Sequence, residues 1–295
     1  MQIESSPVLY AVDSAGIARI TLNRPETGNA QNVAMTYALN DAFVRAAHDN
    51  AVRVIILGGA GKHFSTGHDL KDQTFDAVGR DYPLTSTWAD IDLDSIEGWY
   101  GWEREAFLDM CRRWRSIPKP VIAEVRGACI GGGLMLAWVC DLIIAAENAF
   151  FQDPVVAFGV GGVEYLSHAW ELGARQAKEK LFTTDRWTAD EALAWGMVNR
   201  VVPLDALEQT TLELARKIAA KPAFALKMAK EAINGSLDAQ GLQQAIDRGF
   251  ALHQLAHAQN RLKFGGLLDP TGLPEAIRTS GEVCELVIGK PIGEA

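Results

Sequence analysis

The sequence lacks the features that direct a protein to a membrane, an export pathway or nucleic acid. Its most apolar segment, Leu134 to Ala146, is interrupted by Asp141 and falls short of the roughly 20 residues that span a bilayer. The first residues show no basic stretch followed by an apolar one, so we expect no secretory signal and a cytoplasmic protein without membrane insertion. With 28 Lys and Arg against 37 Asp and Glu, the net charge of −9 disfavours nucleic acid as a partner.

The motifs of nucleotide-binding proteins and serine hydrolases are also missing. The run Gly159 to Gly162 places Glu164 where a dinucleotide-binding G-x-G-x-x-G motif has its last glycine. Gly61-Lys62 is followed by His63, where a P-loop requires Ser or Thr. No G-x-S-x-G is present, so the serine turn of a nucleophile elbow is lacking.

Cysteine is scarce, and the metal-binding signals are weak. His253 and His257 have the i, i+4 spacing of zinc ligands, but Gln254 stands where a zinc protease has its glutamate. We therefore interpret this pair as a solvated or core-edge helix face and expect no metal. No C-x-x-C pair occurs, so we expect reduced, mostly buried thiols at all four cysteines, Cys111, Cys129, Cys140 and Cys284.

What is present is the pattern of an α/β protein. Hydrophobic residues make up 48% of the 295 residues and charged residues 22%, as in an ordinary globular protein. Helical spacing of apolar residues covers Asn32 to His48 and Glu103 to Trp114. Short β-branched runs that end in Gly, Asn or Pro alternate with these segments and predict strands at Ile17–Leu22, Val52–Leu57, Pro120–Val125 and Leu142–Ala145.

The second half of the chain is typical of helices. Thr188 and Glu191 have the spacing of a capping box at the start of a helix, and Gly196 suits the left-handed C-terminal end of the same helix. Amphipathic patterns then predict helices over 206–220, 223–234 and 242–261. We expect an α/β core over residues 1–200 and a helical C-terminal region over 201–295 that serves oligomer contacts and ends in an extended tail.

One long segment, Lys71 to Arg104, has no clean periodicity although it is rich in aromatic residues. Irregular segments of this length inside a compact domain are uncommon and often form a lid or a binding loop. The alternative is an insertion that packs on itself or against a neighbouring subunit. The aromatic residues concerned are Tyr82, Trp88, Trp99, Tyr100 and Trp102.

Two glycine-containing turns follow predicted strands and precede helices. The first runs from Gly58 to Leu70 and the second from Gly127 to Gly133. Glycine lets the backbone approach a ligand closely, and a helix that begins behind the second turn directs free N–H groups toward the ligand. Two such N–H groups that converge on one oxygen would form an oxyanion hole.

These turns belong to a larger set of motifs. The motifs are Asn23-Arg-Pro with Asn29-Ala30, His63-Phe-Ser-Thr-Gly-His-Asp-Leu70, Ile117-Pro-Lys-Pro with Gly127, the Gly131–Gly133 run and Asp141, and Thr184-Asp-Arg186 with Asp190-Glu, Gly196, Asn199 and Val202-Pro203. Their order and spacing resemble the enoyl-CoA hydratase/isomerase (crotonase) superfamily. The resemblance extends from about residue 8 to about residue 262.

The resemblance implies a repeated ββα core of two packed sheets, with a helical C-terminal region that builds homotrimers or dimers of trimers. It implies an acyl-CoA thioester as substrate, so coenzyme A enters with the substrate and no prosthetic group is needed. The backbone N–H groups of His68 and Gly132 would form the oxyanion hole and stabilise the thioester oxygen as it becomes enolate-like.

The sequence departs from the hydratases of this superfamily at two positions. Met135 and Val155 stand where the family's water-activating glutamates are expected, and neither side chain carries a proton. The chain is therefore predicted to be an acyl-CoA-transforming enzyme whose reaction is left open between hydration with other groups, isomerisation and hydrolysis. The alternatives are a catalytically silent acyl-CoA-binding protein and a β-diketone hydrolase that does not use CoA.

Three other side chains are candidates for the acid/base role. Asp153 lies two residues before Val155, and Glu164 follows the Gly159–Gly162 turn. Their alternatives are a turn or cap role for Asp153 and a first-turn helix carboxylate for Glu164. The imidazole of His68 could also act, unless only its backbone matters.

The resemblance also implies ligand contacts. For the CoA moiety we expect contacts from the cations Arg24, Lys71 and Arg278 and from the loop backbone at Ser65 and Thr66. The alternative for the three cations is that they lie on the solvated surface. An apolar acyl pocket is expected from Leu70, Trp88, Trp102, Met135 and Val155.

Overall fold

The computed structural model of the protein describes residues 6–86, 88, 91–278 and 282–289, so parts of the expected extended tail and of the aromatic-rich segment lie outside the described residues. Its main sheet has the strand order β1-β2-β3-β4-β6-β9. The first pair of strands is antiparallel and the other neighbours are parallel. The strands are β1 (Val8–Val12), β2 (Ile17–Leu22), β3 (Val54–Gly59), β4 (Val121–Val125), β6 (Leu142–Ala146) and β9 (Arg200–Val202).

The four predicted strands are confirmed as β2, β3, β4 and β6, and the α/β class with them. The prediction works because β3 and β4 are buried on both faces, which requires an unbroken apolar run with β-branched residues. A second, three-stranded sheet was not predicted. Its strands contain two or three residues each, too few to show a period: β5 (Ala128–Ile130), β7 (Phe150–Gln152) and β8 (Trp187–Thr188).

Helices cover both faces of the main sheet. Alternate side chains of β3 point to opposite faces, so Ile55 packs with helix α1 (Val33–His48) while Ile56 packs with helix α8 (Leu207–Ala219). Helix α1 begins where predicted, because the Asn32 side chain accepts the N–H of Met35. Since α8 is part of the layer structure around the sheet, the predicted C-terminal helical region packs directly on the core.

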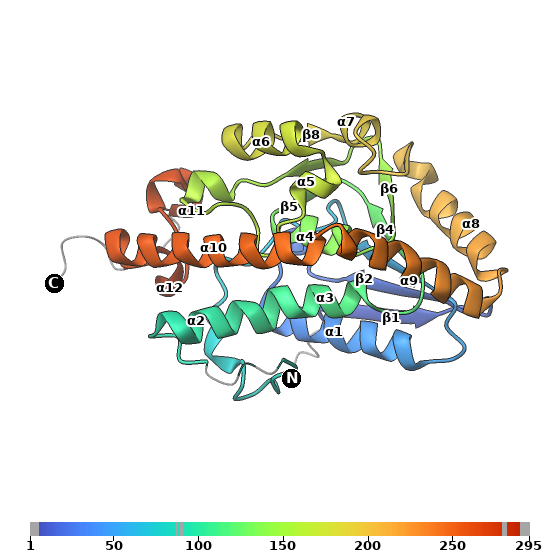
Figure 1. Ribbon diagram of the computed structural model, residues 1–295, viewed down its shortest axis with the longest axis horizontal. Coiled ribbons are helices and arrows are strands. Elements are labelled where there is room, and N and C mark those ends of the chain that lie inside the picture. The colour runs from blue at the N-terminus through green and yellow to red at the C-terminus, as the bar shows by residue number, and fades with distance from the viewer. Residues whose placement is uncertain (1–5, 87, 89–90, 279–281, 290–295) are drawn as a thin grey trace.

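Most of the second half is helical, as predicted, although the short strands β8 and β9 interrupt it. The capping box is present, with the Thr188 hydroxyl accepting the Glu191 N–H and the Glu191 carboxylate accepting the Thr188 N–H. Helix α10 extends along the long axis of the molecule in front of the sheet (Figure 1). No helix among the described residues is both long and apolar enough to cross a bilayer. The helices are α4 (Gly132–Trp138), α5 (His168–Glu171), α6 (Ala174–Thr183), α7 (Ala189–Ala194), α9 (Ala223–Ala239), α10 (Leu242–Phe264), α11 (Glu275–Arg278) and α12 (Glu285–Ile288).

The aromatic-rich segment forms part of the core. It leads through a 3₁₀ turn (Phe75–Ala77) into α2 (Ile96–Glu103), where the rings of Trp99 and Trp102 stack with centroids 5.1 Å apart and are buried. The helix predicted over 103–114 is not a continuous α-helix, because a π-helix (Arg104–Asp109) precedes α3 (Met110–Arg115). Such wide turns are rare in helices and are frequent at functional sites.

All four cysteines are free thiols, as expected. Three of them, Cys111, Cys129 and Cys284, are buried, and Cys140 is half-buried. Burial raises the pKa of each thiol. Neutral, buried thiols behave as small apolar core residues.

Asn29 joins the turn after β2 to the loop after β3. It is fully buried and adopts φ 58°, in the left-handed region that asparagine tolerates better than most residues. Its amide donates to the carbonyl oxygens of Ala60 and His63, and its side-chain oxygen accepts the Arg24 N–H. One side chain thereby satisfies three backbone groups at the carboxyl ends of the strands.

We expect Asn29→Ala to lower the free energy of unfolding by about 3 kcal/mol, because buried backbone groups lose their partners. Urea denaturation measures this change. Asn50→Ala, at an exposed asparagine, is the matched control and should stay within about 0.5 kcal/mol of the wild type. Equal stability of the two variants would show that the Asn29 contacts contribute nothing.

Candidate functional site

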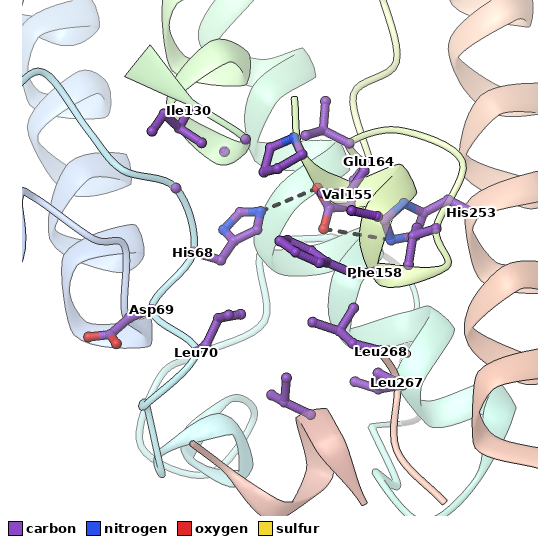
Figure 2. Close-up of a pocket in the computed structure, with 18 of the residues that line it drawn as sticks. His68, Asp69, Leu70, Ile130, Val155, Phe158, Glu164, His253, Leu267 and Leu268 are labelled. Carbon is purple, nitrogen blue, oxygen red and sulfur yellow. Dashed lines mark hydrogen bonds and ion pairs between the residues drawn. The ribbon is translucent and has the colours of Figure 1, made fainter. Parts of the chain in front are cut away.

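A cavity of about 550 Å³ opens beside the two glycine turns. This volume lies in the range of small-molecule sites. Its wall comes from the loop after β3, from α2 and the π-helix, from the start of α4, from the 3₁₀ turn Val155–Phe158 and from α10 (Figure 2). Most of the wall is apolar and includes Leu70, Phe75, Trp99, Trp102, Phe158, Leu267 and Leu268.

The two glycine turns meet because Ser65 pairs with β5. The Ser65 N–H donates to the carbonyl of Ala128, and the Ile130 N–H donates to the carbonyl of Ser65, at 3.1 and 3.0 Å. This short parallel pairing places Gly67 beside Gly132: a Cβ on Gly67 would lie 3.3 Å from the Gly132 nitrogen. Both turns therefore contribute backbone to the same stretch of cavity wall.

The backbone N–H groups of His68 and Gly132 have no acceptor among the described residues, and both residues line the cavity. The absence of a side chain at Gly132 matters here, since a Cβ would lie 2.6 Å from Cε1 of the His68 ring. The geometry thus has what an oxyanion hole needs, namely two backbone donors on adjoining turns that no acceptor of the described residues occupies, at the wall of a mostly apolar cavity.

The imidazole of His68 is held in this cavity by two contacts. Its ring stacks on Phe107 with centroids 3.8 Å apart, and its Nε2 lies 3.3 Å from a carboxylate oxygen of Glu164. Figure 2 shows the Glu164 carboxylate between the rings of His68 and His253. Two of the predicted acid/base candidates, His68 and Glu164, are therefore in direct contact.

A chain of buried charged groups continues behind Glu164. Its second oxygen lies 3.7 Å from Nε2 of His253, which lies 3.3 Å from the Glu103 carboxylate. The other oxygen of Glu103 lies 3.1 Å from Nε2 of His257, and the Gln254 amide also donates to Glu103. Glu103, His253 and His257 all line the cavity and are almost fully buried.

These groups keep one another charged. Burial raises the pKa of Glu103, but His257 and His253 outweigh it and hold the pKa well below its usual value. Burial likewise opposes ionisation of Glu164, yet His68 and His253 keep its pKa below the ordinary range. For His253, burial lowers the pKa, while Glu103 and Glu164 raise it more strongly, to about 9. Two carboxylates are thus ionised within an apolar wall, and each has a positive partner.

Asp153, the third acid/base candidate, lies outside the cavity wall. Its carboxylate accepts the N–H groups of Val155 and Val163 and lies 2.9 Å from Nε2 of the buried His168. These contacts fix the 3₁₀ turn and the segment that carries Glu164. They correspond to the turn role that the sequence left open for Asp153.

The predicted ligand contacts divide into two groups. Thr66, Leu70, Trp102 and Val155 line the cavity, together with the unpredicted cation Arg186. The other six lie elsewhere: Ser65 and Met135 are buried in the core, Trp88 packs on Tyr100, Arg24 pairs with Asp69, Lys71 pairs with Glu282, and Arg278 is exposed. Roles of these cations in CoA binding stay predictions.

The solvated or core-edge reading of the histidine pair is not what the structure shows. Both rings are buried and face Glu103, which the sequence did not single out as a site residue. One sequence signal could have indicated Glu103: it is a charged residue that follows Trp99 and Trp102 closely, in a segment that otherwise predicts burial. The i, i+4 spacing of the histidines was visible, but their carboxylate partner lies about 150 positions earlier in the chain.

Comparison with known proteins agrees with the fold. A family model for enoyl-CoA hydratase/isomerase matches residues 13–268. A protein named as an enoyl-CoA hydratase, EchA13 of Mycobacterium tuberculosis, is 42% identical over 261 residues, which cover 87% of this chain and 82% of that protein.

Solved structures extend the similarity to the whole architecture. A probable enoyl-CoA hydratase from Mycobacterium thermoresistibile is 48% identical, with a TM-score of 0.82 over 90% of this chain and 100% of that one. A monofunctional enoyl CoA isomerase from M. smegmatis is 32% identical, with a TM-score of 0.63 over 81% of this chain and 97% of that one. Motifs, fold and relatives agree, and the chain belongs to the enoyl-CoA hydratase/isomerase family of enzymes.

Proposed function

We propose that this protein transforms an acyl-CoA thioester by stabilising its enolate in an oxyanion hole formed by the N–H groups of His68 and Gly132. The observation that carries the proposal is this pair of N–H groups at an apolar cavity, neither of which has an acceptor in the described part of the chain. The thioester oxygen gains negative charge as the enolate forms, so these donors would bind the transition state more tightly than the substrate. The names of the relatives support the substrate class.

We assign proton transfer to Glu164. Met135 is buried in the core and Val155 contributes only an apolar wall, so the usual hydratase positions offer no acid. Glu164 lies in the cavity wall, is held ionised and contacts His68, the residue that carries one oxyanion donor. A carboxylate there would remove a proton from the carbon next to the thioester and return it to another carbon, which is isomerase chemistry. The isomerase named among the relatives supports this choice.

The first experiment is mass spectrometry of saturated, 2-enoyl and 3-enoyl CoA thioesters incubated with the protein in D₂O. We expect deuterium uptake and movement of the double bond without addition of water. Addition of D₂O to the 2-enoyl thioester would instead identify a hydratase with a non-standard acid. No change in any thioester, with an active crotonase as the positive control, would favour a silent acyl-CoA-binding protein.

Glu164→Gln should reduce the rate of deuterium exchange by about 10²–10⁴-fold, because the amide cannot accept the proton. The same mass-spectrometric assay measures this rate. Glu147→Gln, at an exposed glutamate, is the matched control and should exchange as the wild type does. Unchanged exchange in a folded Glu164→Gln variant would remove Glu164 from the mechanism.

Gly132→Ala should reduce kcat by about 10²–10³-fold, the loss expected when one oxyanion donor is misplaced. The added methyl would meet the His68 ring at 2.6 Å, so either the ring or the turn must shift. Gly161→Ala is the control, since a Cβ there would meet nothing within 4 Å. Wild-type kcat in Gly132→Ala would contradict the proposed oxyanion hole.

The homotrimer or dimer of trimers is part of this proposal. Helix α9 has no buried residue, although it carries Phe224 and Ile233, which are 72% and 64% exposed. Apolar side chains on a helix are typical of a face that is covered by another subunit. Light scattering should give three or six times the 32.1 kDa of the chain. A monomer mass would overturn the proposed assembly without affecting the proposed chemistry.

A further inference from the structure

We propose that Glu103, His253 and His257 bind one divalent transition-metal ion in the cavity wall. The three side chains offer one carboxylate oxygen and two imidazole nitrogens, and these ligand atoms all lie within 4.8 Å of one another. All three residues are buried, so the group is not a chance cluster on the surface. The inference does not depend on which acyl-CoA reaction the enzyme catalyses.

The orientation of both histidines is that of metal ligands. The Nδ1 of His253 lies 2.7 Å from the carbonyl oxygen of Gly162, and the Nδ1 of His257 lies 2.8 Å from that of Leu267. A carbonyl oxygen only accepts hydrogen bonds, so each Nδ1 must carry the proton. A metal ion at this point would replace a proton on Nε2 and bind the lone pair that each ring then directs toward Glu103. Backbone carbonyls commonly fix metal-binding histidines in this way.

The spacing fits an ion at the centre of the group. Zn²⁺ binds histidine nitrogen and carboxylate oxygen at about 2.0–2.2 Å, which in tetrahedral geometry separates two ligands by about 3.4 Å. The Nε2 of His253 lies 3.3 Å from one oxygen of Glu103, and the Nε2 of His257 lies 3.1 Å from the other. With every pair of ligand atoms within 4.8 Å, rotation of these side chains would bring the three ligand atoms to the separations that an ion requires.

Protons on the two rings are the competing way to balance the charge. Protonation of both would put two positive imidazoles, with ring centroids 4.4 Å apart, into a buried site. Moreover, Nε2 of His253 is buried and makes no hydrogen bond among the described residues, although the Glu103 carboxylate is near. One divalent ion would use both lone pairs at a single point and would also lie near the negative charge of Glu164.

The donor set selects the class of ion. Two imidazoles and one carboxylate suit Zn²⁺, Fe²⁺, Mn²⁺ or Co²⁺, whereas Mg²⁺ and Ca²⁺ prefer ligand sets made of oxygen alone. All three ligands line the cavity, so an ion there would keep coordination positions open to water or to an oxygen of a ligand. Three protein ligands with an open position are typical of reactive rather than purely structural sites.

The test uses the full-length protein, stripped with a chelator and titrated with Zn²⁺ or Co²⁺. We expect one ion per chain by elemental analysis, visible absorption of nitrogen- and oxygen-liganded Co²⁺, and a higher Tm with Zn²⁺ because the ion binds the folded state. A wild-type protein that binds no stoichiometric metal would overturn the proposal and leave protons as the occupants of the cluster.

Variants test whether the bound ion lies at these residues. Loss of a residue that only hydrogen-bonds a metal ligand weakens metal binding by about 10–100-fold. Glu103→Gln and His257→Asn remove ligands themselves, so each should weaken Co²⁺ binding by more than this. His48→Asn, at an exposed histidine outside the group, is the control and should bind Co²⁺ as the wild type does. Binding that both site variants leave unchanged would identify an adventitious ion and overturn the proposal. None of these measurements uses a CoA thioester, so a negative result here would contradict the metal site without contradicting the proposed function.

Discussion

The pairing of Ser65 with β5 is the contact on which the cavity depends. Two backbone hydrogen bonds join the loop after β3 to the turn before α4, and the Ser65 hydroxyl donates to the carbonyl of Asn29. The approach is so close that a Cβ on Gly133 would lie 2.6 Å from the Ser65 carbonyl oxygen. Since these bonds exist within the protein alone, the two N–H groups are positioned before any ligand arrives, and binding need not order them.

The strands and turns that could be predicted from the sequence are those whose residue types suit their surroundings in the fold. β3 and β4 are apolar because both faces are buried, and the glycine turns are visible because a side chain would not fit. Glu103 could not be found in this way. A carboxylate on the apolar side of a helix is unfavourable by itself, and only the fold shows that His253 and His257 compensate it. The strands of the second sheet were missed because they have too few residues to show a period.

The cavity combines an apolar wall with one buried polar chain, from His68 through Glu164 to Glu103. Removing one member of such a chain leaves its neighbour charged and without a partner, which costs more than the pair contributes. The members are therefore expected to change together rather than singly. Most of the cavity wall is carbon, and its buried charged groups are gathered at the side where His68, Glu164 and Glu103 lie.

The π-helix between α2 and α3 changes the rotation of α2 about the helix axis relative to α3, which a continuous α-helix would fix. A π-turn holds one residue more than an α-turn, and at 3.6 residues per turn one residue corresponds to about 100° of rotation. Met110 and Trp114 of α3 belong to the core, whereas Glu103 at the end of α2 belongs to the cavity. A one-residue insertion or deletion at this point would rotate α2 relative to α3 and would carry Glu103 out of the cavity together with Trp99 and Trp102, while the core contacts of α3 stay in place. The buried carboxylate and the aromatic part of the cavity wall are therefore linked through α2, and this single wide turn sets the position of both.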